Sequence, residues 1–321
     1  MTPLEKAARA AQHAPSVFNT QPWSWRITGD TLDLYADPGR RLSTVDRDGR
    51  LLLLSCGTAL HHALVTLDAA GWSAAVDRLP DPSEESLLAR IRLGAPTRPD
   101  PWSERMAAAI PERRTDRRSF GERAVSGDEL TRLRHAVEDQ GAYLHLVRPE
   151  QVPVLAVSAD LAAGAELADP AYRAELHRWT TRPDFIGDGV PAGTAVRPDL
   201  RRVPVRDFFP DPAGETGEPS GPAHDQGAAY VVLFGTGDQP ADLLRGGEAL
   251  SALLLLATAD GLATAPISDA VEVEWPRHLL RGLIAGIGEP YLVVRVGYRP
   301  ESAPLAAAPR RDPRDVITIV E

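Results

Sequence analysis

Four arginines lie within one eight-residue stretch near the middle of the chain. Residues 113–120 read RRTDRRSF and include a single acid, Asp116. A guanidinium group offers planar, bidentate donors that match phosphate oxygens, and it keeps its charge at physiological pH. The stretch therefore has the chemistry of a phosphate-binding site. A solvated basic run ahead of a helix has the same composition, so these residues alone leave both interpretations open.

A polar loop near the N-terminus offers a second kind of chemistry. Residues 14–25 read APSVFNTQPWSW, in which Pro15 and Pro22 break the preceding helix. Hydroxyl and amide groups in such a loop can hydrogen-bond to a planar heterocycle. The residues that carry these groups are Ser16, Asn19 and Gln21.

Two long apolar helices must position these groups. The first covers residues 51–70 and stops at Gly71, and the second stops at Gly261. In one constant register, Gly57, Ala59, Leu60, Leu64, Ala69 and Gly71 fall on Gly247, Ala249, Leu250, Leu254, Ala259 and Gly261. Farther on, IRLG at 91–94 resembles VRVG at 294–297. We therefore expect a duplicated α+β fold whose two lobes pack about a pseudo-twofold axis through these helices.

The repeat divides the chain into residues 1–100, an incomplete first lobe, and residues 101–321, the second lobe. Residues 181–227 account for most of the extra length of the second lobe and are rich in proline, glycine and aspartate. A loop this long inside a compact domain is typically a lid, a binding loop or a disordered linker. Its scattered aromatic residues favour a lid.

Composition excludes several classes of protein. A net charge of -10 and a pI near 5.4 argue against a general nucleic-acid surface. The single cysteine, Cys56, excludes an internal disulfide framework, and its apolar setting predicts a core residue rather than a nucleophile. We find no uninterrupted apolar run of membrane-spanning length and no signal peptide, so we expect a cytoplasmic protein that does not enter a membrane.

Other motifs favour neither a dinucleotide fold nor a metal site. The GTG at 235–237 lacks the third glycine of a Rossmann loop and is followed by Pro240. His61 and His62 are adjacent on a helix and point in different directions, so we expect no metal there. Among the other histidines, His177 near the expected lid is the candidate proton donor to test.

Three segments together resemble a known family. APSVFNTQPW is similar to the loop after the first helix of FMN-dependent nitroreductases, and RRTDRRSF resembles the Arg-rich motif of that superfamily. GEALSALLLLATADGLATAPISD resembles its central helix and the flavin loop that follows. Ordinary members build two flavin sites from two identical subunits, whereas each segment occurs once in this chain, as in the two-lobed Acg-like branch. The resemblance covers nearly the whole chain apart from residues 181–227.

The resemblance implies that the arginines hold the phosphate of FMN. Position by position it places Arg114 and Arg118 at the phosphate and flavin edge, with Arg310 or Arg311 from the C-terminal tail closing on the same phosphate. Arg113 and Arg117 are expected instead to pair with acids at the surface. Asp116 stands where many members have serine, and we expect it to orient an arginine.

The resemblance also implies a flavin ring between the lobes. Ser16, Asn19 and Gln21 come from the first lobe. Pro266, Ile267 and Ser268 match the loop near the reactive N5 edge, where Ser268 is a candidate hydrogen-bond donor. Many members have Glu-Gly where this chain has Ser268-Asp269, which weakens the case for ordinary nicotinamide-driven turnover. Because the arginine motif occurs once, we expect one FMN per chain and a monomer that mimics a dimer.

The expected activity is that of an FMN-dependent oxidoreductase that exchanges hydride or electrons with a small planar organic molecule. NADH or NADPH is a candidate reductant. Two alternatives stay open: a specialised dehydrogenase or oxidase acting on one metabolite, and a flavin-sequestering protein with little turnover.

Overall fold

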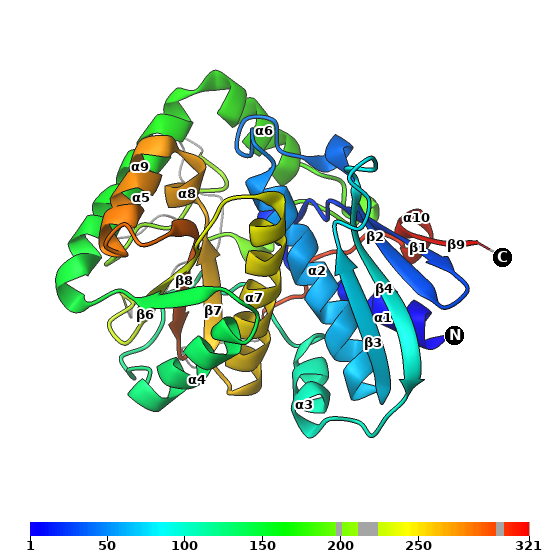
Figure 1. Cartoon of the computed structure of the whole chain (residues 1–321). Coiled ribbons are helices and arrows are strands. Elements are labelled where there is room, and N and C mark those ends of the chain that lie inside the picture. Colours follow the sequence, from blue (N-terminus) through cyan, green and yellow to red (C-terminus); the bar gives the residue numbers. More distant parts are fainter. Residues whose placement is uncertain (197–200, 211–223, 300–304, 321) are drawn as a thin grey trace.

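A computed structural model describes residues 1–196, 201–210, 224–299 and 305–320, and shows two mixed α+β halves on either side of a central helix pair (Figure 1). Parts of the expected lid, residues 197–200 and 211–223, lie outside the described residues. The helices are α1 Pro3–Ala11, α2 Arg50–Ala69, α3 Pro101–Ala109, α4 Gly127–Glu138, α5 Val152–Ala168, α6 Pro170–Thr180, α7 Pro240–Ala259, α8 Asp269–Glu272, α9 Glu274–Leu283 and α10 Pro313–Val316.

The two sheets have the same strand order over four strands. The first runs β3-β4-β2-β1-β9 and the second runs β7-β8-β6-β5. Each sheet has a register shift at an equivalent position. In the first sheet β2 shifts against β4 between Leu34 and Tyr35, and in the second β6 shifts against β8 between Leu233 and Phe234. The strands are β1 Trp23–Thr28, β2 Thr31–Ala36, β3 Trp72–Arg78, β4 Leu87–Pro96, β5 Tyr143–Leu146, β6 Ala229–Gly235, β7 Ala263–Ile267, β8 Glu289–Gly297 and β9 Ile317–Val320.

The helices α2 and α7 cross at two glycines. Gly57 and Gly247 are 190 positions apart in the chain. A Cβ added to Gly57 would lie 2.8 Å from the Gly247 Cα and closer still to the Leu244 carbonyl oxygen. A Cβ added to Gly247 would lie 2.8 Å from the Gly57 Cα and closer still to the Leu54 carbonyl oxygen. The two backbones therefore touch in a reciprocal way that leaves no room for a side chain at either position.

The two sheets pair corresponding residues of IRLG and VRVG with strand residues that are 190 positions apart. Ala74 of β3 pairs with Leu93 of β4, and Thr264 of β7 pairs with Val296 of β8. Ala74 and Thr264 are again 190 positions apart, and Leu93 and Val296 occupy the same place in IRLG and VRVG. The predicted hairpin around Gly29 is confirmed, as are the capping boxes that begin α1 and α4.

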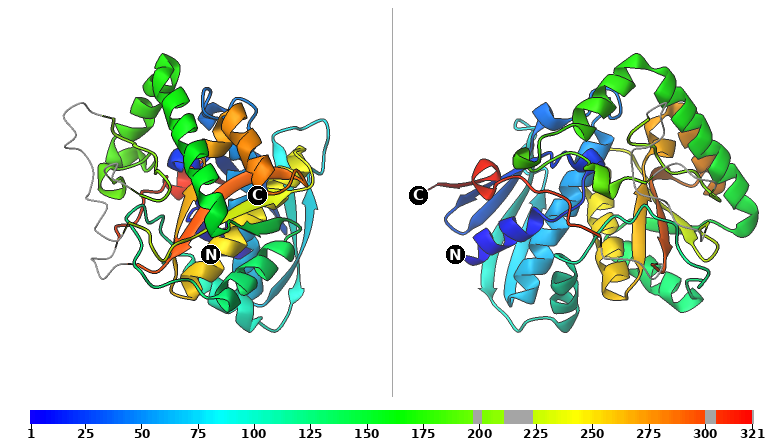
Figure 2. Two further views of the ribbon diagram at one scale, coloured as in Figure 1. Left: turned by 90° about the vertical axis from the view of Figure 1, so that its left-hand side faces the viewer. Right: turned by 180° about the vertical axis from the view of Figure 1, so that it is seen from behind.

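Two expected boundaries differ from the structure. The turn that joins β1 to β2 is only two residues long, whereas α5 and α6 lie between β5 and β6, so the extra chain begins near residue 147 rather than at 181. The last strand, β9, pairs in parallel with β1 at the edge of the first sheet, as the right view of Figure 2 shows. The C-terminus thus returns to the first lobe, and a boundary at residue 100 does not separate the two sheets.

Helix α2 also corrects the expectation about membrane-spanning length. Among the described residues it is the one helix long and apolar enough to cross a bilayer. It is mostly buried within the protein, between the first sheet and α7 (Figure 1). Its apolar character therefore follows from its place in the core. Cys56 is buried on this helix, where burial raises the pKa of its thiol, and it packs as a core residue as predicted.

Candidate functional site

Two adjoining cavities lie between the halves of the molecule. One, which we call the basic cavity, has a volume of about 200 Å³, and the other, the apolar cavity, has a volume of about 100 Å³. Residues from the N-terminal loop and from the arginine stretch line both cavities: Pro15, Ser16, Thr115 and Arg117. The two polar segments singled out in the sequence are therefore brought together in one place.

Four arginines and no acid line the basic cavity within the described part of the chain: Arg113, Arg114, Arg117 and Arg310. Arg113 is only 4% exposed, and its Nε and Nη1 have no hydrogen-bond partner there. Burial, together with the charges of Arg310 and Arg114, lowers the pKa of Arg113 to about 9. Burial and then Arg114 lower the pKa of Arg310 to about 10. An anion in this cavity would relieve the repulsion among these buried cations.

The N-terminal loop positions Arg310. Its Nη1 donates to the Asn19 Oδ1 at 2.6 Å, and its Nη2 donates to the His13 carbonyl oxygen at 3.0 Å. The Asn19 Nδ2 in turn donates to the Gly189 and Pro309 carbonyl oxygens, both at 3.1 Å. Asn19 lines the cavity and joins three segments that are far apart in the sequence.

Gln21 and Arg311 line neither cavity, but their hydrogen bonds hold the segments that do. The Gln21 Nε2 donates to the Gly187 carbonyl oxygen at 2.8 Å, and its Oε1 accepts from the Arg311 backbone N–H at 3.0 Å. The Arg311 Nη1 donates to the backbone oxygens of Gln21 and Trp23. Of the tail pair, the structure thus places Arg310, and not Arg311, at the basic cavity.

The apolar cavity is a slot between α2, α7 and the end of β7. Its aliphatic and aromatic walls include Phe18, Leu54, Leu250, Ile267 and Leu292. Its hydroxyl groups come from Ser16, Ser55, Thr58, Thr115 and Ser268. The predicted loop residues Pro266, Ile267 and Ser268 all line it, as does the predicted Ser16.

The arginines of residues 113–120 that line the cavities are not all those that we expected. Arg118 bonds to Asp116 through Nη2 to Oδ2 at 2.7 Å and through Nε to Oδ1 at 2.9 Å, and it lines neither cavity. Asp116 therefore orients an arginine, as predicted. The expected surface positions of Arg113 and Arg117 are wrong, because Arg113 is buried and Arg117 lies with its guanidinium 4.6 Å from the centre of the Phe208 ring. Spacing along the sequence did not indicate which arginine turns inward.

Residues 201–210 cover part of the apolar cavity. Val205, Arg206 and Phe208 line it, and the Phe208 ring meets the Phe18 ring edge-on at 5.5 Å. The Arg206 guanidinium donates to the Asp269 Oδ1 at 2.8 Å, to the Glu272 Oε2 at 2.7 Å and to the Tyr172 hydroxyl oxygen at 2.8 Å. These buried bonds tie the covering segment to α8 and α6.

One other sequence candidate lies elsewhere. His177 is exposed on α6 and lines neither cavity. His13, which the sequence did not single out, lines the basic cavity, where burial and then Arg310 lower its pKa. No group of His, Cys, Asp and Glu in the described ranges is placed to hold a metal ion.

Comparison with known proteins gives the family. No family model matches the chain. A Mycobacterium tuberculosis H37Rv protein named "Putative NAD(P)H nitroreductase Rv3131" is 38% identical over 311 residues, which cover 96% of this chain and 88% of that protein. "Putative NAD(P)H nitroreductase acg" of the same organism is 35% identical over 310 residues, covering 96% and 93%.

A solved nitroreductase with bound FMN from Desulfitobacterium hafniense is 15% identical, with a TM-score of 0.40, and covers 68% of this chain and 98% of its own. That similarity is too low to assign a property to this chain. The curated relatives span nearly its full length at more than 30% identity. The chain therefore belongs to the nitroreductase superfamily, in its Acg-like branch.

Proposed function

We propose that the protein is an FMN-dependent oxidoreductase that binds one FMN across the paired cavities. The observation that carries the proposal is the basic cavity, where four arginines converge without an acid and share lining residues with an apolar slot. FMN has the matching polarity, because it joins a phosphate of about two negative charges to a planar apolar ring system.

The phosphate would lie against Arg113, Arg114 and Arg310. Charge-assisted hydrogen bonds would satisfy the Arg113 nitrogens that have no partner among the described residues. The ring would occupy the slot between Leu54 and Ile267, with the Ser268 hydroxyl at its edge. When bound, the flavin supplies the hydride and electron chemistry. The chain's own residues bind it, exclude water and donate hydrogen bonds near N5.

We further propose that the chain arose from a duplication and retains one of two pseudo-equivalent sites. Identical sheet order, matching ladder registers and the reciprocal glycine contacts support this. Thr58 and Ser268 line the apolar cavity, and the same 190-position offset relates them to Glu248 and Arg78. Those two residues form a bidentate ion pair, with both N···O distances 2.7 Å. The equivalent location is therefore filled by side chains of the chain itself.

Reductase activity is tested by anaerobic stopped-flow mixing of the purified yellow protein with NADH and with NADPH. Faster loss of the flavin's visible absorbance with NADH or NADPH than in buffer without nucleotide supports the reductase assignment, which the names of the relatives suggest. A protein that purifies without colour and takes up no added FMN refutes the whole proposal.

A second candidate, a flavin-sequestering protein, is favoured by the cover over the slot. Arg206 and Phe208 close the apolar cavity, and Arg206 is buried and held by three partners. Under this alternative the flavin is reduced by dithionite but not by NADH or NADPH. Replacing Arg206 by Met should then restore reactivity, whereas Arg202→Met, on the same segment but exposed, should not.

A further inference from the structure

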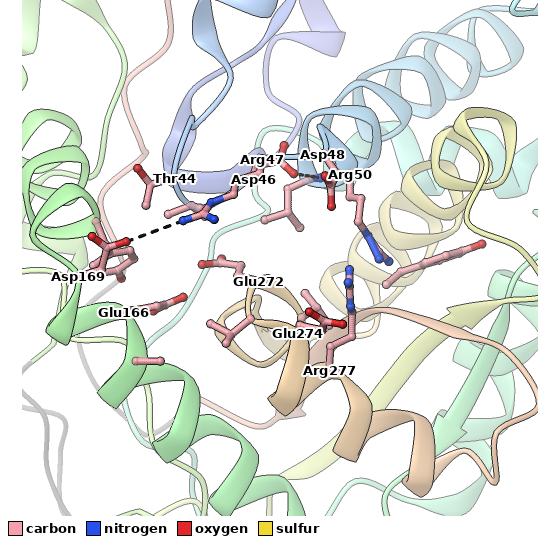
Figure 3. A pocket seen from close by; sticks show the side chains of 17 residues that line it. Thr44, Asp46, Arg47, Asp48, Arg50, Glu166, Asp169, Glu272, Glu274 and Arg277 are labelled. Carbon is pink, nitrogen blue, oxygen red and sulfur yellow. Dashed lines mark hydrogen bonds and ion pairs between the residues drawn. The ribbon is translucent and has the colours of Figure 1, made fainter.

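A third cavity lies on the far side of Arg206 from the apolar slot. It is formed by the start of α2, the end of α5 and the α8–α9 region, and its volume is about 360 Å³, within the range of small-molecule sites. Its lining is mostly charged. In Figure 3, Glu166 and Glu272 lie toward one end and Arg50 and Arg277 face each other at the other, while Arg47 lies beside Asp169 at the first end and Glu274 lies near Arg277 at the second. We call it the bipolar cavity.

The acidic end carries more negative charge than its arginine neutralises. Glu166, Asp269 and Glu272 surround the guanidinium of Arg206, with the Glu166 Oε1 3.6 Å from its Nη2. Glu166 is only 7% exposed, and its Oε1 has no hydrogen-bond partner among the described residues. The Glu272 Oε1 is likewise without one. A buried carboxylate oxygen left in this way calls for a donor from outside the chain.

The basic end has the opposite imbalance. Arg50 pairs with Asp238, with its Nη1 3.0 Å from the Oδ2, and its Nη2 donates to the Pro290 carbonyl oxygen at 3.1 Å. Arg277 forms no ion pair within the described ranges, and its buried Nε has no hydrogen-bond partner there. Burial lowers the pKa of Arg50, Asp238 opposes this, and Arg277 lowers it further. Arg50 thus has a carboxylate partner, whereas the Arg277 Nε has no hydrogen-bond partner among the described residues.

We propose that the bipolar cavity binds a small zwitterion, with its ammonium group against Glu166 and Glu272 and its carboxylate against Arg50 and Arg277. A ligand with one charge would compensate only one end and leave the other as it is. A neutral apolar ligand would desolvate buried charges without pairing them. The site adjoins the apolar cavity at Leu51 and Arg206 but has its own unpaired charges, so the proposal does not depend on the proposed function.

Protonation at the acidic end provides an independent signature. Burial raises the pKa of Glu166 to about 10, with Arg206 opposing and Glu272 and Asp269 adding to the rise. The groups that face Glu166 are therefore Arg206 from the covering segment, Asp269 and Glu272 from α8, and Tyr172 from α6. Burial and the neighbouring carboxylates, including a side-chain hydrogen bond with Glu272, therefore favour the protonated form of Glu166 in the absence of a cation. An arriving ammonium group should displace this proton into solvent.

Calorimetric titration of the purified full-length protein tests the proposal. Glycine, 4-aminobutyrate and 6-aminohexanoate are the zwitterionic probes, with increasing charge separation, and butyrate and butylamine are the single-charge probes. At least one zwitterion should bind tenfold or more tightly than both single-charge probes. Binding heat should vary with the ionisation enthalpy of the buffer, reporting proton release. Failure of all three zwitterions to bind, or equal binding of either single-charge probe, overturns the proposal.

Matched variants locate the site. Arg277→Gln should weaken the binding of the best zwitterion at least fivefold. Arg281→Gln, the same change on α9 at a residue that pairs with Glu289, should leave it unchanged. Glu166→Gln should abolish the buffer-dependent proton release. Equal effects of the two arginine variants, or proton release that persists in Glu166→Gln, would contradict the proposed location. Thermal melting checks that each variant is folded.

Discussion

At the scale of single residues, the buried charge of Arg113 should have opposite effects on stability without and with a bound phosphate. Without a ligand its buried charge is repelled by Arg310 and Arg114. With phosphate present the same charge becomes a source of binding energy, because charge-assisted hydrogen bonds contribute about 1.5–3 kcal/mol. One side chain thus destabilises the empty protein and stabilises the loaded one.

Arg113→Gln should therefore weaken FMN binding about 10- to 100-fold, since about 1.4 kcal/mol is one factor of ten. The empty variant should melt at a higher temperature than the empty wild type, because a repelled buried charge is gone. Fluorescence titration of FMN and differential scanning calorimetry measure the two effects. Arg118→Gln is the control, since Arg118 pairs with Asp116 outside the cavities. A larger loss of affinity in Arg118→Gln would restore the original assignment from the sequence.

The histidines on α2 form a second site whose chemistry is visible residue by residue. The Ser251 hydroxyl lies 2.8 Å from the His61 Nδ1 and 2.9 Å from the His62 Nδ1, and the His62 Nδ1 also faces the Thr58 carbonyl oxygen at 2.9 Å. A carbonyl oxygen can only accept, so His62 carries its proton on Nδ1 and Ser251 donates to His61. The two histidines therefore join α2 to α7 as neutral groups.

Burial lowers the pKa of His61 to about 4 from an ordinary value of 6.5, and lowers that of His62 as well. The unfolded chain binds more protons than the folded one between these values, so stability is full above pH 6.5 and falls as the pH drops toward 4. Between pH 6.5 and 4, the free energy of unfolding of His61→Asn should fall by up to about 3 kcal/mol less than that of the wild type. Urea unfolding at pH 7, 6, 5 and 4 measures the difference. Parallel pH profiles for the two proteins would show that His61 is not the cause.

At the scale of elements, the crossing of α2 and α7 depends on the absence of side chains. Gly57→Ala would place a Cβ into the Leu244 carbonyl, which is backbone and cannot turn away. We expect a loss of several kcal/mol in the free energy of unfolding, measured by urea titration. Gly164→Ala on α5 is the control, because nothing lies within 4 Å of its added Cβ. That change should be neutral or stabilising by about 0.5–1 kcal/mol. Similar losses in both variants would contradict the close crossing.

Elements with strong local signals could be predicted from the sequence. The capping boxes at Thr2 and Ser126, the turn at Gly29 and the two central helices were all indicated by adjacent residues. The ends of the long insertion could not be predicted. A helical pattern such as that of α5 or α6 does not show whether the helix belongs to the repeated unit or to an insertion. The pairing of β9 with β1 is a contact between the two ends of the chain, which no local pattern encodes.

The candidate site was predictable in part for the same reason. Ser16, Asn19, Pro266, Ile267 and Ser268 belong to loops with distinctive composition, and all five line the cavities. Within the arginine stretch the choice of side chain depends on local pairing. Asp116 holds Arg118 and leaves Arg113 to turn toward Arg310 from the other end of the chain. Such a choice depends on tertiary packing, which the spacing of residues does not contain.

At the scale of the whole molecule, the proposed duplication implies two pseudo-equivalent sites that have diverged. A dimer of identical subunits must repeat each site, because its interface is the same on both sides. In one chain the two interfaces can diverge. Here one holds the paired cavities, and the other is filled by the bidentate pair of Arg78 and Glu248. The C-terminal tail that carries Arg310 returns only to the first lobe, so its guanidinium also serves one site.

One FMN per chain should therefore be the full load, and a second chain should not be needed to complete the site. Native mass spectrometry of the protein saturated with FMN should show a single chain with one flavin, and absorbance titration should saturate at a ratio of one. Arg78→Ala removes the ion pair with Glu248. The change should not raise the number of flavins per chain, because among the described residues we find no arginine cluster around this pair that could bind a second phosphate. Two flavins per chain would refute the filled site, and one flavin per two chains would mean that each site draws residues from a partner copy.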